Sequence, residues 1–352
     1  MSENIAEITA CATLRGRGLA LMSGGLDSTL SVCVLRAQGL HMEGVVFESP
    51  FFGSVRARKA AAMLGITLHV VDFTDDIVEL LKNPPHGFGS AMNPCIDCHT
   101  RMLQRAGAMM EKMGFDFLST GEVLNQRPMS QTRRALGLVA NDAGFVGRIV
   151  RPLSALRLDP TEPEKCGIID RSRLLGLNGR SRHEQMKMAP HYGIREYPTP
   201  AGGCLLTEPR FCAKVQDLMT HEGLDQKRLL WLLPLGRQMR LPGGAKCIIG
   251  RNRADNEALG RAATPPDVLV QTVIVPGPTL LLPGGASAED VARACGICAG
   301  YADPSADSSQ TLVEVICGSV RTEHATTPLA RDESDKWILS SACSGVTACA
   351  ED

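Results

Sequence analysis

The chain has 352 residues, enough for two or three domains of ordinary size (roughly 100–200 residues each). Hydrophobic residues make up 44% and charged residues 21%, a composition that excludes a fibrous or broadly disordered protein. Lys and Arg number 37 against 38 Asp and Glu, so a basic surface for nucleic acid has to be local. With aromatic residues at 4%, base stacking is excluded as the main mode of binding.

The thirteen cysteines are scattered along the chain, which opens without the basic and apolar segments of a signal peptide. No apolar run is long enough to span a membrane. We therefore expect a cytoplasmic protein with no membrane partner. In a reducing compartment, a close pair of cysteines indicates a metal site or catalysis rather than a structural disulfide.

The first half of the chain alternates between strand-like and helix-like periods. Short apolar runs predict strands, and amphipathic stretches that end at glycine predict helices. The strands are expected at 18–22, 44–48, 67–73 and 115–120, and the helices at 27–38, 55–64 and 100–113. This alternation predicts an α/β fold, a parallel sheet with helices on both faces, and ligands bind at the carboxyl ends of such strands.

The second half has a different pattern. Prolines interrupt the segment from about 148 to 242, in which helices are expected at 210–220 and 225–233. A smaller α+β domain is expected to follow a boundary near residue 243. Its strands are predicted at 247–249, 268–275, 279–282 and 311–317, and its helix at 288–302.

Charge is distributed unevenly. Residues 127–187 hold twelve Lys and Arg against six Asp and Glu, a net of +6, whereas residues 289–352 have a net of −7. The basic stretch is either a surface that binds a phosphate backbone or an ordinary solvated face. As RNA-binding residues we single out Arg127, Arg133, Arg134, Arg180 and Arg182.

The strongest motif is SGGLDS at 23–28, directly after the first predicted strand and at the start of the first helix. Two glycines allow close approach of a ligand to the backbone, and the helix N-terminus attracts anions. Asp27 would repel a phosphate, so we expect it to hold Mg²⁺ or to position a nearby donor. The GxxxxGK[ST] pattern of nucleotide kinases is lacking.

SGGLDS resembles the PP-loop of the ATP-pyrophosphatase superfamily, whose members split ATP into AMP and pyrophosphate and adenylate a carbonyl oxygen. The resemblance implies an adenine nucleotide alpha hydrolase-like domain that uses ATP and Mg²⁺. It implies a catalytic role for Asp27, and we expect Glu48 near the adenosine. The expected ATP-binding residues are Ser23, Gly24, Gly25, Asp27, Ser28, Phe47, Gly121 and Gln126.

Two further motifs indicate which branch of this superfamily the chain resembles. NPCIDCH at 93–99 carries a CxxC pair, and TGEVLNQ at 120–126 with MSQT at 129–132 leaves the fourth predicted strand toward the same cleft. Together they resemble the catalytic domain of tRNA 4-thiouridine synthases, within the tRNA-thiolating branch of the superfamily. The long N-terminal RNA-binding region and the rhodanese-like extension of the full synthases have no counterpart in this sequence.

A third cysteine, Cys204, follows two glycines in the run PAGGCLLT at 200–207. It matches the second essential cysteine of tRNA-thiolating enzymes, which implies catalytic roles for Cys95 and Cys204. Three thiolates from Cys95, Cys98 and Cys204 would also suit a 4Fe–4S cluster with one open iron for hydrosulfide. The alternative is a persulfide and disulfide relay between Cys95 and Cys204. Zinc would require a fourth ligand, for which His99 is the nearby candidate.

The segment from about 245 to 320 resembles the NFACT RNA-binding domain, on the residues IGRN at 249–252, PGP at 276–278 and the Ala-rich helix after them. A second CxxC, at 295–298, is expected to pack in the core of that helix. The expected domains are a PP-loop ATP-binding domain at 1–165, a connecting region with the distal cysteine at 166–243, an NFACT RNA-binding-like domain at 244–340 and a tail at 341–352.

These features predict an ATP-dependent tRNA sulfurtransferase that adenylates a uridine carbonyl oxygen and replaces it with sulfur. Its partners would be tRNA and a sulfur donor, either a cysteine desulfurase, a sulfur carrier or sulfide. Two alternatives stay open at this point. One is a PP-loop ligase that forms a C–N bond, and the other is a non-enzymatic RNA-binding protein with an inactive PP-loop.

Overall fold

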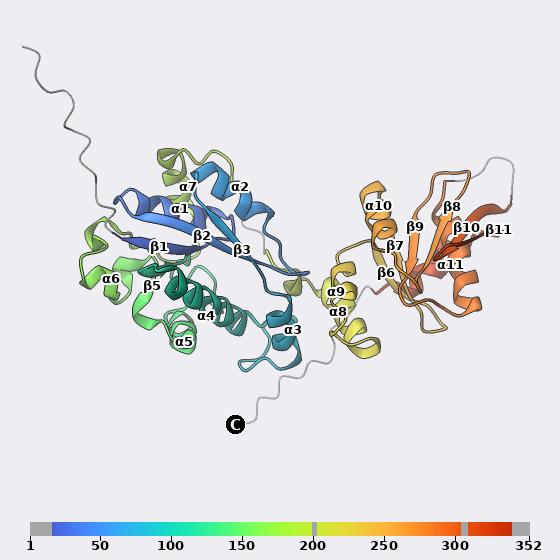
Figure 1. Ribbon diagram of the computed structural model, residues 1–352, viewed down its shortest axis with the longest axis horizontal. Helices are drawn as coiled ribbons and strands as arrows, with labels where there is room; N and C mark the ends of the chain where they lie inside the picture. Colours follow the sequence, from blue (N-terminus) through green and yellow to red (C-terminus); the bar gives the residue numbers. More distant parts are fainter. Residues whose placement is uncertain (1–15, 199–202, 304–308, 340–352) are drawn as a thin grey trace, which may run out of the picture. The chain divides into compact units, whose positions relative to one another are not determined.

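A computed structural model describes residues 16–198, 203–303 and 309–339. The chain forms two compact units, one that ends at Leu205 and one that begins at Leu206 (Figure 1). The expected tail at 341–352, and Pro200, Ala201 and Gly202 before the distal cysteine, lie outside the described residues.

The first unit is built on a five-stranded parallel sheet with the order β3-β2-β1-β4-β5. The order reverses direction between β1 and β4, and this is where parallel sheets bind ligands, beyond the carboxyl ends of the strands. The strands are β1 (Arg17–Leu21), β2 (His41–Glu48), β3 (Leu68–Asp72), β4 (Phe117–Ser119) and β5 (Ile149–Val150).

Helices cover both faces of this sheet, as the ribbon in Figure 1 shows. One face carries α1 (Leu26–Arg36), α2 (Val55–Leu64) and α7 (His183–Met188). The other carries α3 (Thr74–Lys82), α4 (Cys95–Met113) and α5 (Arg133–Ala143), and the short α6 (Glu162–Lys165) follows β5. The central strands are buried on both sides, so the predicted α/β fold is confirmed.

The structure differs from the expected elements mainly around the first cysteine pair. The helix predicted at 100–113 begins at Cys95, so the CxxC motif forms its first turn rather than a preceding loop. Pro94 stands just before that turn, a position at which its missing N–H is not needed. Helix α3 was not predicted. Its first turn carries Asp75 and Asp76, which suit a helix N-terminus.

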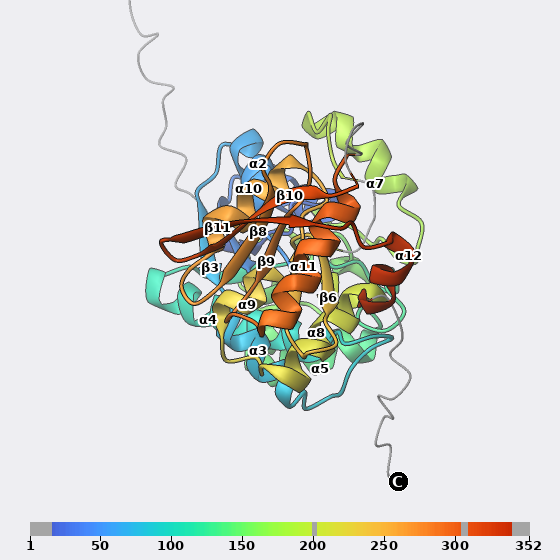
Figure 2. The ribbon, with the colours of Figure 1, turned by 90° about the vertical axis from the view of Figure 1, so that its right-hand side faces the viewer.

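The second unit contains a six-stranded antiparallel sheet with the order β11-β10-β8-β9-β7-β6 (Figure 2). Its strands are β6 (Arg237–Arg240), β7 (Lys246–Ile249), β8 (Val268–Thr272), β9 (Thr279–Leu282), β10 (Thr311–Cys317) and β11 (Val320–Thr326). Its helices are α8 (Pro209–His221), α9 (Lys227–Leu232), α10 (Arg253–Ala262), α11 (Ala288–Tyr301) and α12 (Arg331–Ser334).

Helix α11 packs its apolar side on this sheet. Cys295 and Cys298 are buried there beside Cys247 of β7, and burial raises the pKa of the Cys298 thiol to about 12. The prediction that the second CxxC fills the core is therefore confirmed.

The expected connecting region is divided between the two units. Its part up to Leu205, with Cys204, belongs to the first unit. Helix α8 belongs to the second, because its Asp217 accepts hydrogen bonds from Arg240 of β6 and Lys246 of β7 at 2.7 and 2.9 Å. Across the described ranges, no helix is both long and apolar enough to cross a membrane.

Candidate active site

The SGGLDS loop joins β1 to α1 at the carboxyl edge of the parallel sheet. Within the loop, the Ser28 hydroxyl donates to the Gly25 carbonyl at 3.0 Å and lies 3.2 Å from the Ser23 hydroxyl. Gly25 is the N-cap residue of α1, and glycine has no side chain with which to cap the first N–H groups. These groups are therefore directed at the space beyond the loop, as in other anion sites at helix N-termini.

Gly24 is required by both its backbone conformation and its surroundings. Its φ of +72° is in the left-handed region, which favours glycine. A Cβ atom at this position would overlap the backbone of Arg56 and Ala57 in the first turn of α2. The loop is thus enclosed on one side by α2.

The TGE segment encloses the loop on the other side. Gly121 follows β4, and a Cβ atom on it would lie 2.5 Å from the Cα of Ser28 and 2.6 Å from the carbonyl carbon of Asp27. The buried hydroxyls of Ser31 in α1 and Ser119 in β4 also lie 2.9 Å apart. The two segments that flank the reversal of strand order are therefore in direct contact.

Asp27 is held by residues from distant parts of the first unit. Its Oδ2 accepts a hydrogen bond from Gln126 Nε2 at 2.8 Å, and Gln126 Oε1 accepts one from Gln185 Nε2 of α7 at 3.0 Å. Arg182 Nε lies 3.7 Å from the same carboxylate oxygen. Asp27 Oδ1 and Arg182 Nε are buried and have no hydrogen-bond partner among the described residues.

Glu122 connects the TGE segment to the CxxC helix. Its carboxylate accepts a hydrogen bond from Arg151 Nε at 2.9 Å and lies 3.7 Å from His99 Nδ1. Burial alone would raise the pKa of Glu122, but Arg151 and His99 outweigh it and lower the pKa to about 2. His99 therefore contacts the carboxylate that follows Gly121, which ties the helix of Cys95 to the PP-loop.

Cys95 and Cys204 are close enough to Cys98 to affect the ionisation of its thiol. Cys95 starts α4, where Asn93 Nδ2 donates to its Sγ at 3.1 Å. Burial raises the pKa of the Cys98 thiol well above its usual range, and its neighbours Cys204 and Cys95 raise it further. The chain after Cys204 is anchored at the carboxyl end of β2, where Leu205 N donates to the Phe51 carbonyl at 2.9 Å.

The arrangement of these thiols bears on metal binding. Among the described residues, no group of three or more His, Cys, Asp and Glu side chains is arranged to hold one metal ion. The donor set is nevertheless of the right chemical kind for a cluster, because the two residues with the largest electrostatic effect on the Cys98 thiol are themselves thiols, Cys204 and Cys95.

The end of β2 was expected near adenosine. Phe47 is buried there and packs edge-on against Phe73 with ring centroids 5.3 Å apart, so its ring is part of the core. The Glu48 carboxylate accepts a hydrogen bond from Ser54 at 2.6 Å, which holds the start of α2.

Four of the five arginines expected to bind RNA are exposed: Arg127, Arg133, Arg134 and Arg180. The segments of Arg127 and Arg180 are neighbours, since Gly179 N donates to the Leu124 carbonyl at 2.8 Å. Arg182 differs from these four. Its side chain is 15% exposed and faces Asp27, so it belongs to the PP-loop site.

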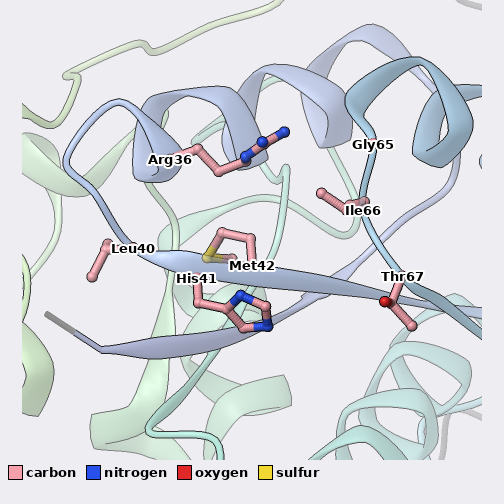
Figure 3. A pocket seen from close by; sticks show the side chains of 7 residues that line it. All are labelled: Arg36, Leu40, His41, Met42, Gly65, Ile66 and Thr67. Carbon is pink, nitrogen blue, oxygen red and sulfur yellow. The ribbon is translucent and has the colours of Figure 1, made fainter. Parts of the chain in front are cut away.

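A separate cavity of about 240 Å³ lies at the opposite edge of the sheet, by the amino ends of β2 and β3 (Figure 3). Its lining residues are Arg36, Leu40, His41, Met42, Gly65, Ile66 and Thr67. This set includes none of the residues predicted for the site. The cavity is therefore separate from the PP-loop and from the cysteines.

Some residues of the site were not predicted. Gln131 of the MSQT segment is 7% exposed, and its Oε1 is buried with no hydrogen-bond partner in the described part of the chain. Gln185 and Arg151 come from segments that carry no motif. Gln131 could have been found from its place in the motif, whereas the other two depend on tertiary contacts.

Comparison with known proteins agrees with this geometry. Residues 13–161 match the family model described as thiamine biosynthesis protein (ThiI), and residues 236–338 match that of the NFACT protein RNA binding domain. Both expected resemblances are confirmed. The match to the ThiI model thus lies in the first unit (called the ThiI-type domain below), and the match to the NFACT model lies in the second (called the NFACT-type domain).

Several curated proteins are similar to part of this chain. A tRNA-specific 2-thiouridylase from Sulfurimonas denitrificans is 36% identical over 29% of this chain and 33% of its own length. A probable tRNA sulfurtransferase from Thermoanaerobacter is 33% identical over 42% of this chain and 38% of its own. The one from Bacillus subtilis is 32% identical over 46% and 39%. The chain thus spans well under two thirds of these relatives.

Among solved structures, a 4-thiouridine synthetase in complex with RNA and ATP is 20% identical, with a TM-score of 0.34. The match covers 50% of this chain and 52% of that chain.

Proposed function

We propose that this protein is an ATP-dependent tRNA sulfurtransferase. It adenylates a uridine carbonyl oxygen of tRNA, releases pyrophosphate, and replaces the oxygen with sulfur as AMP leaves. The ThiI-type domain and the thiouridylase and sulfurtransferase relatives support this assignment.

One observation carries the proposal: the contacts that join the PP-loop to the cysteine helix. Gly121 packs on Ser28, and the next residue, Glu122, faces His99 beside Cys98. An adenylation site and a thiol site in one continuous structure suit a reaction that activates a carbon and then delivers sulfur to it. A ligase that forms C–N bonds would not need the thiols.

In the adenylation step, the phosphates of ATP bind the backbone N–H groups at the start of α1. Ser23, Gly24, Gly25 and Ser28 form the loop around them. The buried Asp27 Oδ1 is an oxygen ligand of the kind that Mg²⁺ prefers, and it has no partner within the described ranges. The site therefore fits the ion that accompanies ATP.

Sulfur is delivered at Cys95, Cys98 and Cys204. A 4Fe–4S cluster on these thiols would supply an open iron site for hydrosulfide, and this is the first version of the sulfur step. The second version is a relay in which Cys95 or Cys204 carries a persulfide whose outer sulfur attacks the activated carbon as AMP leaves. The other thiol then attacks the inner sulfur, which frees the thiolated base and closes a disulfide that an external thiol reduces. In that version Cys98 has no required role, because two thiols complete the relay.

RNA would be bound on the ThiI-type domain by the exposed arginines Arg127, Arg133, Arg134 and Arg180. The NFACT-type domain supports a second RNA contact. In the relay the sulfur donor is a cysteine desulfurase or a sulfur carrier that already holds persulfide-level sulfur, because a thiol and sulfide form a persulfide only with an oxidant. Sulfide is the donor in the cluster version, where hydrosulfide attacks the activated carbon without a change of oxidation state.

The decisive experiment is mass spectrometry of tRNA nucleosides from cells with the gene, without it, and with an Asp27→Ala copy. A thiouridine should be present with the wild-type gene and lost in the other two strains. Purified protein should also release pyrophosphate from ATP when bulk tRNA is added. An unchanged set of thionucleosides would contradict the proposal, and an inactive PP-loop would explain a complete lack of pyrophosphate release.

A further inference from the structure

Arg182 has an unusual position for an arginine in a basic stretch. It stands at the N-cap of α7, its side chain is 15% exposed, and its Nε is buried without a hydrogen-bond partner in the described chain. The nearest carboxylate oxygen, Asp27 Oδ2, is 3.7 Å away, too far for a hydrogen bond. A buried guanidinium with an unused donor is costly unless a ligand completes it.

The contacts around Arg182 make α7 a fixed part of the PP-loop site. Gln185, one turn along α7, is 1% exposed and donates to Gln126, which in turn donates to Asp27. Helix α7 packs on α1, the helix that the PP-loop begins. Packed side chains, and not a flexible surface segment, therefore hold Arg182 beside the loop.

Charge indicates the ligand. Asp27 alone would repel a phosphate chain at the start of α1, and a cation beside it offsets that repulsion. A guanidinium has forked donors that match phosphate oxygens, and such charge-assisted bonds are among the strong ones. The phosphate chain of a nucleoside triphosphate would supply the partner that Arg182 Nε lacks.

We propose that Arg182 binds the β- and γ-phosphates of ATP and stays with the pyrophosphate as it leaves. The proposal rests on the adenylation step of the proposed function. In that step the substrate oxygen bonds to the α-phosphorus, and the bond from the α-phosphorus to the bridging oxygen breaks. The bridging oxygen leaves with the electron pair, and Arg182 faces the charge that then develops on pyrophosphate.

The alternative is that Arg182 has a structural role and only neutralises Asp27. The two roles differ in their dependence on the ligand. If its role is structural, replacing Arg182 would distort the loop and weaken the binding of ATP and AMP alike. If Arg182 binds phosphate, its replacement weakens the binding of ATP and inorganic pyrophosphate. The binding of AMP is unaffected, because AMP lacks the β- and γ-phosphates.

The test uses the full chain and titration calorimetry with ATP, AMP and inorganic pyrophosphate in the presence of Mg²⁺. The variants are Arg182→Gln, Arg182→Lys and, as a matched control, Arg195→Gln, which removes an exposed arginine from the same segment. In Arg182→Gln we expect ATP and pyrophosphate to bind about tenfold or more weakly, because one charge-assisted bond is removed. AMP affinity should not change, and Arg195→Gln should match the wild type.

Wild-type pyrophosphate affinity in Arg182→Gln, or an equal loss for ATP and AMP, overturns the proposal. If that variant does not fold, Arg182→Lys decides, because a lysine lacks the forked donors and should bind pyrophosphate several-fold more weakly; wild-type affinity there also overturns it. A wild-type protein that binds no ATP would instead contradict the proposed function, so the two failures are distinguishable.

Discussion

Gly121 lies directly against the backbone of Ser28, so the segment after β4 and the loop after β1 have no room for a side chain between them. Because these strands flank the point where the strand order reverses, the contact closes the gap between the two segments at the edge where a parallel sheet binds ligands. The glycine of the TGE segment is therefore needed for close approach, and its φ is not in the left-handed region.

Gly121→Ala should displace the PP-loop, because the added Cβ would lie 2.5 Å from the Ser28 Cα. We expect a loss of stability of about 1–3 kcal/mol, as for other overpacked positions, and a large loss of ATP affinity. Thermal unfolding and nucleotide titration would measure the two effects.

Gly137→Ala is the matched control, because a Cβ at this position in α5 meets no atom within 4 Å. It should stabilise the protein by about 0.5–1 kcal/mol, since alanine is the better helix former. If Gly121→Ala has the same thermal stability and ATP affinity as Gly137→Ala, the close approach of Gly121 to Ser28 is not required for folding or for nucleotide binding.

Asp27→Asn tests the carboxylate that organises the PP-loop. Asparagine keeps the shape and can still accept from Gln126, but it removes the negative charge that faces Arg182 and that would attract Mg²⁺. We expect pyrophosphate release to fall by at least about 10²-fold while the unfolding midpoint changes little, as for the loss of other electrostatic interactions in catalysis. Normal pyrophosphate release in this variant would contradict a catalytic role for Asp27.

Glu122→Gln tests the link between the two halves of the site and has a defined pH dependence. The pKa of Glu122 is lowered from 4.5 to about 2 in the folded protein. The stability that this carboxylate contributes is therefore present above pH 4.5 and is lost as the pH falls toward 2. Glu122→Gln should lower the midpoint of thermal unfolding at pH 7. The difference in midpoint between the variant and the wild type should shrink as the pH falls from 4.5 toward 2, and unfolding measured across this pH range would show it.

The fold was predictable because it depends on local patterns. The expected and observed bounds of α2 are identical, since the helix ends at Gly65 in a left-handed conformation. Strand β11 was not predicted, because six of its seven residues are exposed and its sequence lacks an apolar alternation. It exists because it pairs along its length with β10, an interaction that no local pattern reveals.

The candidate site was predictable where its residues lie in motifs at strand ends. SGGLDS, CxxC and TGE were all recognised, and the sheet brings them together. The position of Arg182 beside Asp27 was not predictable, because it depends on the packing of α7 against α1. From sequence alone it was one more arginine of a basic stretch.

The exposed arginines are expected to control RNA affinity. Replacing Arg127, Arg133, Arg134 and Arg180 by glutamine should weaken tRNA binding and make it less dependent on salt. The slope of the logarithm of the binding constant against the logarithm of salt concentration should become shallower by about 0.7–0.9 for each phosphate that is no longer bound. Binding assays across a salt series would measure this. A control that neutralises the exposed Lys59 and Lys112 should leave the slope unchanged. If the salt slope is the same in both variants, the four arginines form an ordinary solvated face and do not contact RNA.

Cys98 distinguishes the two versions of the sulfur step. A cluster needs three thiolates, so Cys98→Ala should remove the iron, the brown colour and the thiolation activity from protein purified without oxygen. A relay needs only Cys95 and Cys204, so the same variant should keep most of its activity. Cys166→Ala, which removes an exposed thiol of the same unit, is the control and should change neither iron content nor activity. The cluster version would be contradicted by a wild-type protein that contains no iron and still thiolates tRNA. The relay version would be contradicted if the wild type contains no iron and Cys98→Ala nevertheless loses its activity.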